Sequence, residues 1–166
     1  MISISLIIDN IRSAENIGSI FRLADGLGVR HIYICGISPY PKIAYDRRLK
    51  HIIDNVSRKI HKSALGAEKS VSFSYHEDIL KLVDKLHQEN YSLIAIEQDH
   101  RSVSLLGCNM PRKKICLILG NEVEGVNKNL LELVDQIVEI PMSGTKESFN
   151  VASAAAMALF WLKYKS

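Results

Sequence analysis

Short runs rich in β-branched and other apolar residues alternate along this chain with segments whose apolar residues recur at helical spacing. The runs predict strands at residues 3–8, 31–35, 70–74, 93–96, 115–119 and 136–140. The helical spacing predicts helices at residues 17–27, 47–53, 77–89, 127–133 and 149–163. Strands that are separated by helices form βαβ units, in which the strands run parallel. The pattern therefore predicts an α/β fold with a mainly parallel sheet and helices on both of its faces.

Local signals at the helix ends agree with this pattern. Asn16 is the expected N-cap of the first helix and Gly28 its end, and Asn127 is the expected N-cap of the fourth helix. Helical spacing places Arg22 on the same side of the first helix as Gly18, so Arg22 projects on the side of the end that begins at Asn16.

Three polar, glycine-bearing loops lie beyond predicted strands. The first runs from Asn16 to Arg22, the second covers residues 120–125 and the third covers residues 141–150. In an open α/β sheet, ligands bind beyond the carboxyl ends of the strands, so we expect the three loops to form one site. They offer many backbone N–H and C=O groups and few strong nucleophiles. This composition suits the binding of a polar cofactor that itself supplies the reactive group.

The length of 166 residues fits one compact domain, and we expect a single domain over residues 1–166. The apolar N-terminus lacks the basic start of a secretory signal, and the longest helix-like apolar stretch, 149–162, is shorter than the roughly 18 residues of a membrane span. The three cysteines and six histidines lack the spacing of disulfide frameworks or metal sites. We therefore expect a cytoplasmic protein with reduced, buried cysteines, no metal and no membrane contact.

Positive charge is concentrated in residues 42–69, which contain eight Lys and Arg against three Asp and Glu. This segment carries +5, whereas the whole chain carries +3. It coincides with residues 36–67, where the pattern is least regular and we expect a long functional loop. A basic stretch of this kind is typical of proteins with a polyanionic partner, although a solvated surface with incidental basic residues is the alternative explanation.

Three familiar motifs are excluded. Residues 120–125 resemble part of a phosphate-binding loop, but Val126 and Asn127 stand where that loop requires Lys and Ser or Thr. Gly26 and Gly28 lie at a helix end rather than between a strand and a helix, so the dinucleotide-binding fingerprint is missing. The sequence also has no G-x-S-x-G elbow of a serine hydrolase.

The predicted helix at residues 149–163 is rich in alanine and ends in bulky aromatic residues. Small side chains allow a close approach of neighbouring backbones, so this helix is either wedged into the core or part of a subunit interface. Trp161 near its end favours the interface, because large aromatic residues anchor such contacts.

Three segments carry a resemblance that covers nearly the whole chain. They read N-I-G-S-I-F-R-L-A-D-G-L-G-V (16–29), L-I-L-G-N-E-V-E-G-V (117–126) and I-P-M-S-G-T-K-E-S-F-N-V-A-S-A (140–154). In this order they resemble motifs 1, 2 and 3 of the SpoU (TrmH-like) branch of the SPOUT RNA methyltransferases, and K-S-A-L-G-A-E-K (62–69) resembles a segment of bacterial members. The resemblance implies S-adenosylmethionine-dependent methylation of a ribose 2′-hydroxyl in tRNA or rRNA. It also implies a homodimer and a deep trefoil knot in the C-terminal part.

The resemblance further implies roles for single residues. Arg22 would assist the ribose hydroxyl, either as a base or by stabilising negative charge, and we favour the second role because a guanidinium holds its proton firmly. The expected catalytic residues are Arg22, Asn16, Glu122, Ser148 and Asn150. The expected cofactor-binding residues are Leu119, Gly120, Asn121, Glu122, Gly125, Ile140, Met142, Ser148, Phe149 and Asn150. The expected RNA-binding residues are Arg12, Arg47, Arg48, Arg58 and Lys62.

The chain also departs from its relatives. Family members often carry Leu and Ser where this chain has Phe149 and Ala152, which keeps an apolar wall but removes one hydroxyl. Many relatives have RNA-binding extensions that this sequence lacks, so recognition would depend on the catalytic domain. Two other functions stay open: a catalytically silent RNA-binding relative, and a methyltransferase that acts on a base nitrogen. Whether Glu97 and Gln98 contact the cofactor is also open.

Overall fold

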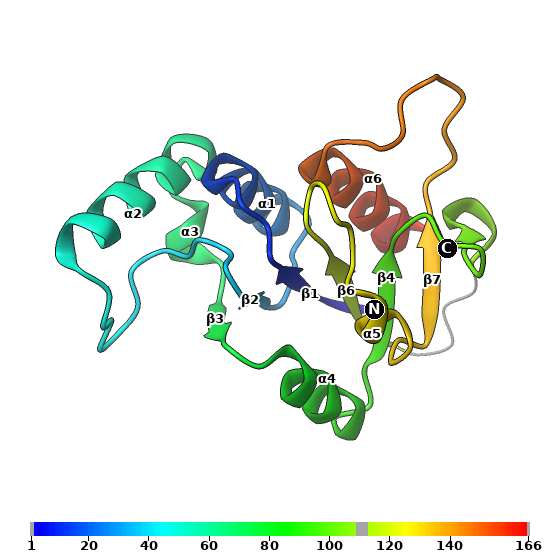
Figure 1. Cartoon of the computed structure of the whole chain (residues 1–166), viewed down its shortest axis with the longest axis horizontal. Helices are drawn as coiled ribbons and strands as arrows, with labels where there is room; N and C mark the ends of the chain where they lie inside the picture. Colours follow the sequence, from blue (N-terminus) through cyan, green and yellow to red (C-terminus); the bar gives the residue numbers. More distant parts are fainter. Residues whose placement is uncertain (1, 109–112, 166) are drawn as a thin grey trace.

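Seven strands form one sheet within the part of the chain that the computed structural model describes, residues 2–108 and 113–165 (Figure 1). Their order across the sheet is β3-β2-β1-β6-β4-β7-β5, and every neighbouring pair is parallel. The bounds are β1 Ser3–Asp9, β2 Ile32–Cys35, β3 Phe73–His76, β4 Ser92–Ile96, β5 Val103–Ser104, β6 Lys114–Leu119 and β7 Gln136–Glu139. Because the strands are parallel, all their carboxyl ends lie along one edge of the sheet.

Helices cover both faces of the sheet, which confirms the predicted α/β fold. One face carries α1 Ala14–Gly26, α2 Lys50–Ala64, α3 Ala67–Ser70 and α6 Val151–Tyr164, and the other carries α4 Ile79–Gln88 and α5 Lys128–Leu131 (Figure 1). Leu6 and Ile8 of β1 belong to the core under the first group of helices, and Ile7 belongs to the core under the second. Burial on both faces explains why β1 reads as a continuous apolar run rather than an alternating one.

Five of the six predicted strands agree with β1, β2, β4, β6 and β7 to within one residue at each end. The strand predicted at residues 70–74 is wrong in position, because residues 67–70 form α3 and β3 begins only at Phe73. The two-residue strand β5 and the short 3-10 helix at Leu105–Gly107 were not predicted, since segments of this length carry no periodic pattern.

The first helix begins three residues earlier than predicted. Its N-cap is Ser13, whose hydroxyl oxygen accepts a hydrogen bond of 3.1 Å from the backbone N–H of Asn16. Asn16 therefore lies in the first turn, and its side chain is not used for capping. The prediction that Gly28 ends this helix is confirmed, because Gly28 adopts a φ of +63° and its N–H donates to the carbonyl of Asp25.

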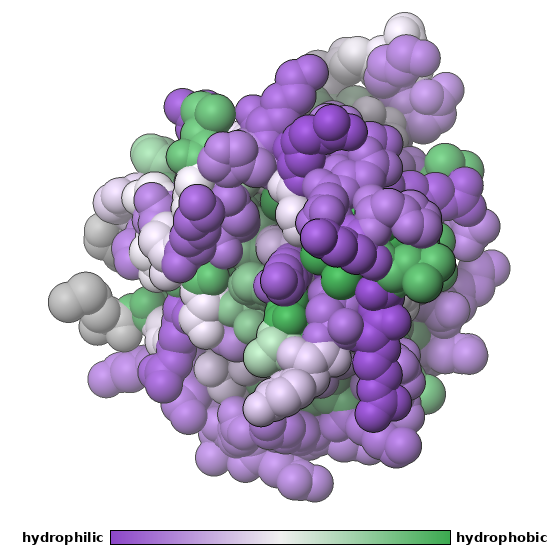
Figure 2. Space-filling model, turned by 90° about the vertical axis from the view of Figure 1, so that its left-hand side faces the viewer, coloured by the Kyte–Doolittle hydropathy of each residue, from purple (hydrophilic) through white to green (hydrophobic). Residues whose placement is uncertain are grey.

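The long loop predicted at residues 36–67 is wrong for its second half, which forms the fifteen-residue helix α2, and the helix predicted at residues 47–53 overlaps only the first turn of α2. Ile53, Ile60 and Ala64 recur at helical spacing and are buried, while the basic residues between them face outward. Gly18 of α1 faces α2, because a side chain at Gly18 would overlap Ser63 and the carbonyl of Ile60. The α2 side of the molecule is mainly hydrophilic at its surface (Figure 2).

The last helix, α6, is wedged into the core along one side, which agrees with one of the two alternatives for it, and the subunit interface stays a prediction. Ala155, Ala158 and Leu159 are buried in the core, whereas Phe160 is 61% exposed. Asn127 caps α5, as predicted. Within residues 2–108 and 113–165, none of the helices has the length and apolar character that a membrane crossing requires.

Candidate active site

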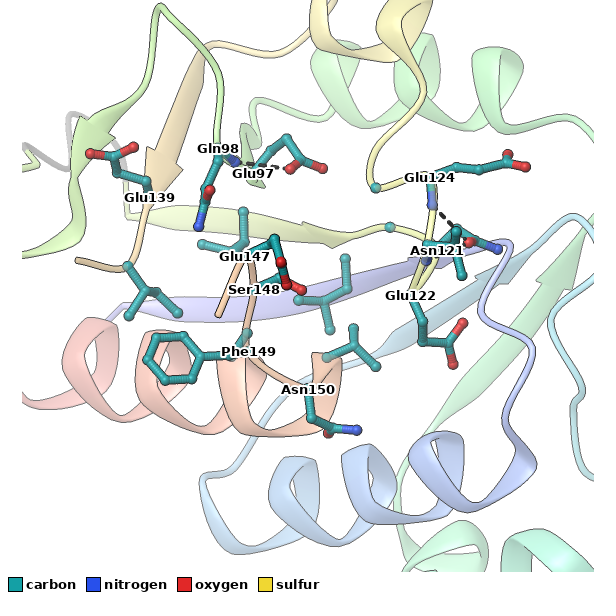
Figure 3. A pocket seen from close by; sticks show the side chains of 18 residues that line it. Glu97, Gln98, Asn121, Glu122, Glu124, Glu139, Glu147, Ser148, Phe149 and Asn150 are labelled. Atoms are coloured by element: carbon teal, nitrogen blue, oxygen red, sulfur yellow. Dashed lines mark hydrogen bonds between the residues drawn. The ribbon is translucent and has the colours of Figure 1, made fainter. Parts of the chain in front are cut away.

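The carboxyl edge of the sheet holds a cavity of about 490 Å³. Its walls come from the residues that follow β4, β6 and β7 and from the start of α6 (Figure 3). Two of the three predicted loops, at residues 120–125 and 141–150, therefore meet at one cavity. The cavity is lined by Ile96, Glu97, Gln98, Leu119, Gly120, Asn121, Glu122, Val123, Glu124, Gly125, Glu139, Ile140, Glu147, Ser148, Phe149, Asn150, Val151 and Ala154. Its volume is typical of small-molecule sites.

The bend at residues 120–125 is held by its own backbone and by Asn121. Asn121 and Gly125 exchange two backbone hydrogen bonds of 3.0 Å. The side-chain oxygen of Asn121 accepts from the N–H groups of Val123 and Glu124, at 2.8 and 3.0 Å, and its amide nitrogen donates to the carbonyl of Asn10, at 2.7 Å. The Asn121 side chain thus shapes the bend, and the bend presents its backbone to the cavity.

Glu97 ties the loop after β4 to this bend. Its Oε2 accepts a hydrogen bond of 2.7 Å from the N–H of Val126, and its Oε1 accepts one of 2.9 Å from the N–H of Gln98. A side chain at Gly125 would overlap the Glu97 carboxylate, so the close approach requires glycine there. Gln98 in turn donates to the sulfur of Met142 at 3.6 Å. These contacts connect the three loops that follow β4, β6 and β7.

Glu122 points from the bend toward the start of α1 (Figure 3). Its carboxylate accepts hydrogen bonds from the backbone N–H groups of Arg12 and Ser13, at 3.0 and 3.2 Å, and from the side-chain amide of Asn16, at 3.0 Å. Partial burial acts to raise the pKa of Glu122, but the three donors outweigh it and the pKa lies below its ordinary value. Glu122 is therefore an ionised anchor for the N-terminus of α1.

Asn16 joins the first predicted loop to the third. Its side-chain oxygen accepts a hydrogen bond of 3.1 Å from the amide of Asn150. Asn150 is the N-cap of α6, and its own side-chain oxygen accepts from two N–H groups of that helix, at 2.9 and 3.4 Å. The chain Glu122–Asn16–Asn150 therefore links all three loops. Asn16 is available for this link because Ser13 caps α1.

The charged groups of the cavity are acidic. Among the described residues that line it there are five glutamates and no lysine, arginine or histidine. Apolar side chains complete the wall, from Leu119, Ile140 and Phe149. Such a cavity favours a ligand that carries positive charge next to an apolar or aromatic part.

A second hollow of about 1040 Å³, called the groove below, lies between α1, the end of α2 and α6. Asn150 lines both the cavity and the groove, and Asn16 lines the groove, so this hydrogen-bonded pair forms a partition between them. Arg22 and Lys62 bring positive charge to the groove. Among the described residues the guanidinium of Arg22 makes no hydrogen bond or ion pair, and it is exposed.

Nine of the ten expected cofactor-binding residues line the cavity. The exception is Met142, which reaches the site through its contact with Gln98. Of the expected catalytic residues, Glu122, Ser148 and Asn150 line the cavity, whereas Asn16 and Arg22 line the groove. Glu97 and Gln98 also line the cavity, and their position directly after a strand of the predicted sheet is the signal that identifies them.

The expected RNA-binding residues differ in their exposure to solvent. Arg12, Arg47, Arg58 and Lys62 are exposed. Arg48 is partly buried in an ion pair with Asp46, with 2.6 Å between Nη2 and Oδ2, and hydrogen bonds from Arg48 hold the pKa of Asp46 below its ordinary value. Within the described ranges no group of three His, Cys, Asp or Glu side chains is placed to hold a metal ion.

Solved structures share this fold. The SpoU methyltransferase AviRb from Streptomyces viridochromogenes, in complex with the cofactor AdoMet, matches with a TM-score of 0.79 at 24% identity, over 98% of this chain and 57% of that one. The A. aeolicus TrmH/SpoU tRNA modifying enzyme matches with a TM-score of 0.78 at 20% identity, over 98% of this chain and 75% of that one.

Sequence comparisons agree. The 23S rRNA (guanosine-2'-O-)-methyltransferase RlmB of Neisseria meningitidis is 30% identical over 154 residues, which is 93% of this chain and 55% of the relative. The tRNA (guanosine(18)-2'-O)-methyltransferase of Borreliella burgdorferi is 20% identical over 159 residues, 96% of this chain and 65% of the relative. The chain thus spans a little over half the length of these curated relatives. Residues 3–160 match the family described as the SpoU rRNA Methylase family, and the chain belongs to that family.

Proposed function

We propose that this protein transfers a methyl group from S-adenosylmethionine to a ribose 2′-hydroxyl of tRNA or rRNA. The observation that carries this proposal is the joining of an acidic cavity to a basic groove through the Glu122–Asn16–Asn150 chain. Family membership and the activities named for the relatives support the same reaction. We treat residues 1–166 as one methyltransferase domain, because the described strands form a single sheet.

The cavity fits the cofactor in size and charge. S-adenosylmethionine carries a sulfonium, an ammonium and one carboxylate group, so its net charge is positive, and the cavity offers glutamates and no cationic side chain among its described lining. The apolar side chains of Leu119, Ile140 and Phe149 suit its adenine ring, and the bend at residues 120–125 provides backbone groups for its polar edges. When bound, the cofactor supplies a methyl group that is activated by the positive sulfur.

Arg22 is the residue that we assign to the acceptor. Transfer would form a bond between the ribose oxygen and the methyl carbon and break the methyl–sulfur bond, with the hydroxyl proton released to water. An exposed guanidinium in the groove can stabilise the negative charge that develops on this oxygen. Asn16 positions the partition between the two hollows, and Lys62 offers a contact for an RNA phosphate.

We also propose that the protein is a homodimer in which a second copy covers the aromatic end of the groove. Phe160 and Tyr164 of α6 are 61% and 59% exposed, and aromatic residues of this size anchor subunit contacts. The other end of the groove, which contains Asn16 and Arg22, would stay open to the RNA ribose that accepts the methyl group.

The reaction can be tested directly with methyl-labelled S-adenosylmethionine and total RNA from a strain that lacks the gene. Nuclease P1 digestion followed by mass spectrometry should find the label on ribose. Label on a base nitrogen would assign the protein to base methylation instead. Binding of RNA without cofactor uptake, measured by calorimetry, would identify a catalytically silent relative.

A further inference from the structure

The loop between β2 and α2, residues 36–49, holds one aromatic side chain entirely in solvent. Tyr45 is 99% exposed and adopts a φ of +56°. Bulky residues rarely occupy this left-handed region, and where they do the surrounding structure must enforce it. Residues with such enforced conformations concentrate at ligand-binding sites, so Tyr45 is a candidate binding residue.

The segment that carries Tyr45, called the Tyr45 loop below, is held together by contacts of Arg48. The Arg48 guanidinium donates to both carboxylate oxygens of Asp46, at 2.9 and 2.6 Å, and to the carbonyls of Tyr40 and Pro41, at 3.0 and 3.3 Å. It also lies 3.6 Å from the centre of the Tyr40 ring. These contacts clamp the chain on both sides of Tyr45.

A second set of contacts fixes the clamp to the sheet. The Tyr40 ring stacks on Tyr75 of β3, with 4.2 Å between ring centres. The hydroxyl of Tyr75 donates a hydrogen bond of 2.9 Å to the carbonyl of Gly36, directly after β2. The Tyr45 ring is therefore presented from a preorganised support, and binding to it costs little ordering.

Exposed basic residues lie on both sides of Tyr45 along the chain. Asp46 and Arg48 neutralise each other inside the loop, and the remaining charged side chains between residues 37 and 50 are Lys42, Arg47 and Lys50, all of them exposed. The basic surface continues along α2 through Arg58 and Lys62, on the hydrophilic side of the molecule (Figure 2). An exposed ring among lysines and arginines is the combination that binds single-stranded nucleic acid, in which bases stack on the ring and phosphates contact the cations.

We propose that the Tyr45 loop is an RNA-binding point separate from the methyl-transfer cavity. Tyr45 stacks on an unpaired base of the RNA, and Lys42, Arg47 and Lys50 contact the flanking phosphates. The proposal rests on the proposed function, because it takes RNA as the substrate. It adds an aromatic contact that selects unpaired nucleotides, which basic residues alone cannot do.

The test compares two fluorescein-labelled 20-mers, one of mixed-sequence single-stranded RNA and one abasic ribose-phosphate strand, by fluorescence anisotropy. Tyr45→Ala should weaken binding of the base-containing strand about tenfold and leave the abasic strand unchanged. Tyr45→Trp should keep full affinity, and Tyr45→Leu, which keeps apolar bulk without an aromatic face, should behave like Tyr45→Ala. Arg47→Ala should weaken both strands equally and reduce the salt dependence.

Several outcomes would overturn the proposal. Unchanged RNA affinity in Tyr45→Ala, equal losses for both strands, or a loss of dimerisation in that variant would each do so. Because Tyr45 is 99% exposed, thermal unfolding should be the same in the three Tyr45 variants as in the wild type. Uptake of S-adenosylhomocysteine by Tyr45→Ala, measured by calorimetry, should equal that of the wild type. If the wild type itself takes up no cofactor and methylates no RNA, the proposed function fails; if it does both and Tyr45→Ala binds RNA normally, only the Tyr45 loop proposal fails.

Discussion

Side chains at the carboxyl edge of the sheet differ in whether they form hydrogen bonds with the backbone of the surrounding loops. Glu97 and Glu122 use their carboxylate oxygens to accept from backbone N–H groups of neighbouring loops, and the side-chain oxygen of Asn121 accepts from N–H groups of its own bend. Arg22 makes no such contact among the described residues and faces the open groove. We therefore expect changes in the first group to affect stability and cofactor affinity together, and a change at Arg22 to affect turnover alone.

Arg22→Ala should lower the rate of methyl transfer by roughly 10²- to 10³-fold, the loss typical of a removed charge stabiliser. Single-turnover kinetics with saturating RNA measure this rate, and calorimetry with S-adenosylhomocysteine should give unchanged affinity. Arg30→Ala, at an exposed arginine outside both hollows, is the matched control. A near-normal single-turnover rate in Arg22→Ala would remove Arg22 from the mechanism.

Glu122→Gln should make the stability of the protein less dependent on pH. Because the pKa of Glu122 is lowered in the folded state, its carboxylate stabilises the fold above the unfolded value of roughly 4.3, and this contribution is lost as the pH falls through the folded value. At pH 7 we expect the variant to lose about 1 kcal/mol of unfolding free energy, allowing for partial exposure. Urea unfolding at pH 7 and at pH 3 measures it, with Glu77→Gln as the exposed control. A difference of equal size at both pH values would contradict the assignment.

For single residues, the sequence motifs identify most of the residues that line the cavity, but not the hydrogen bonds that their side chains make. The positions follow from loops after parallel strands, which a sequence reveals. The hydrogen bonds join residues that are distant in the sequence: Glu122 accepts from Arg12 across 110 positions, and Asn150 donates to Asn16 across 134. Arg48 looks like any basic residue of its segment until Asp46 and Tyr40 are seen beside it.

Among the secondary-structure elements, α2 shows most clearly why a surface helix is hard to predict from sequence, since only its first turn falls within a predicted helix. Its buried residues are few, Ile53, Ile60 and Ala64, and the rest of the helix is charged or polar, so the periodic signal is thin. The strands were easier because β1, β4 and β6 are buried on both faces and read as unbroken apolar runs. Short elements such as α3 and β5 exist through tertiary contacts, which no local pattern records.

The basic side of α2 should make RNA binding dependent on salt. If Arg58 and Lys62 contact phosphates, the double variant Arg58→Gln, Lys62→Gln should lower the slope of log affinity against log salt by about 1.5. Anisotropy titrations of single-stranded RNA between low and physiological salt give this slope. The control pair Lys81→Gln, Lys128→Gln lies on α4 and α5 at the opposite face and should leave the slope unchanged. A flat dependence for the wild type would count against phosphate contacts altogether.

For the molecule as a whole, the parallel α/β architecture was predicted but the strand order was not. Strands β1, β2 and β3 follow one another from the centre of the sheet to one edge, and β6 lies between β1 and β4. Such an order is set by how helices pack on the two faces, which the spacing of apolar residues does not encode. The trefoil knot implied by the resemblance stays a prediction.

Phe160→Asp should convert a dimer into a monomer, because a charge would be buried at the aromatic end of the groove. Sedimentation equilibrium measures the mass of both proteins. Leu80→Asp, at an exposed leucine of α4 on the opposite face, should remain dimeric. A wild type that is monomeric at all concentrations, or a dimeric Phe160→Asp, would argue against the proposed interface.

Asn150 belongs at once to the wall of the cavity, to the first turn of α6 and to the hydrogen bond with Asn16. A substitution at Asn150 is therefore expected to disturb the cavity wall, the capping of α6 and the contact with α1 at the same time, so that an effect on one of the two hollows carries over to the other.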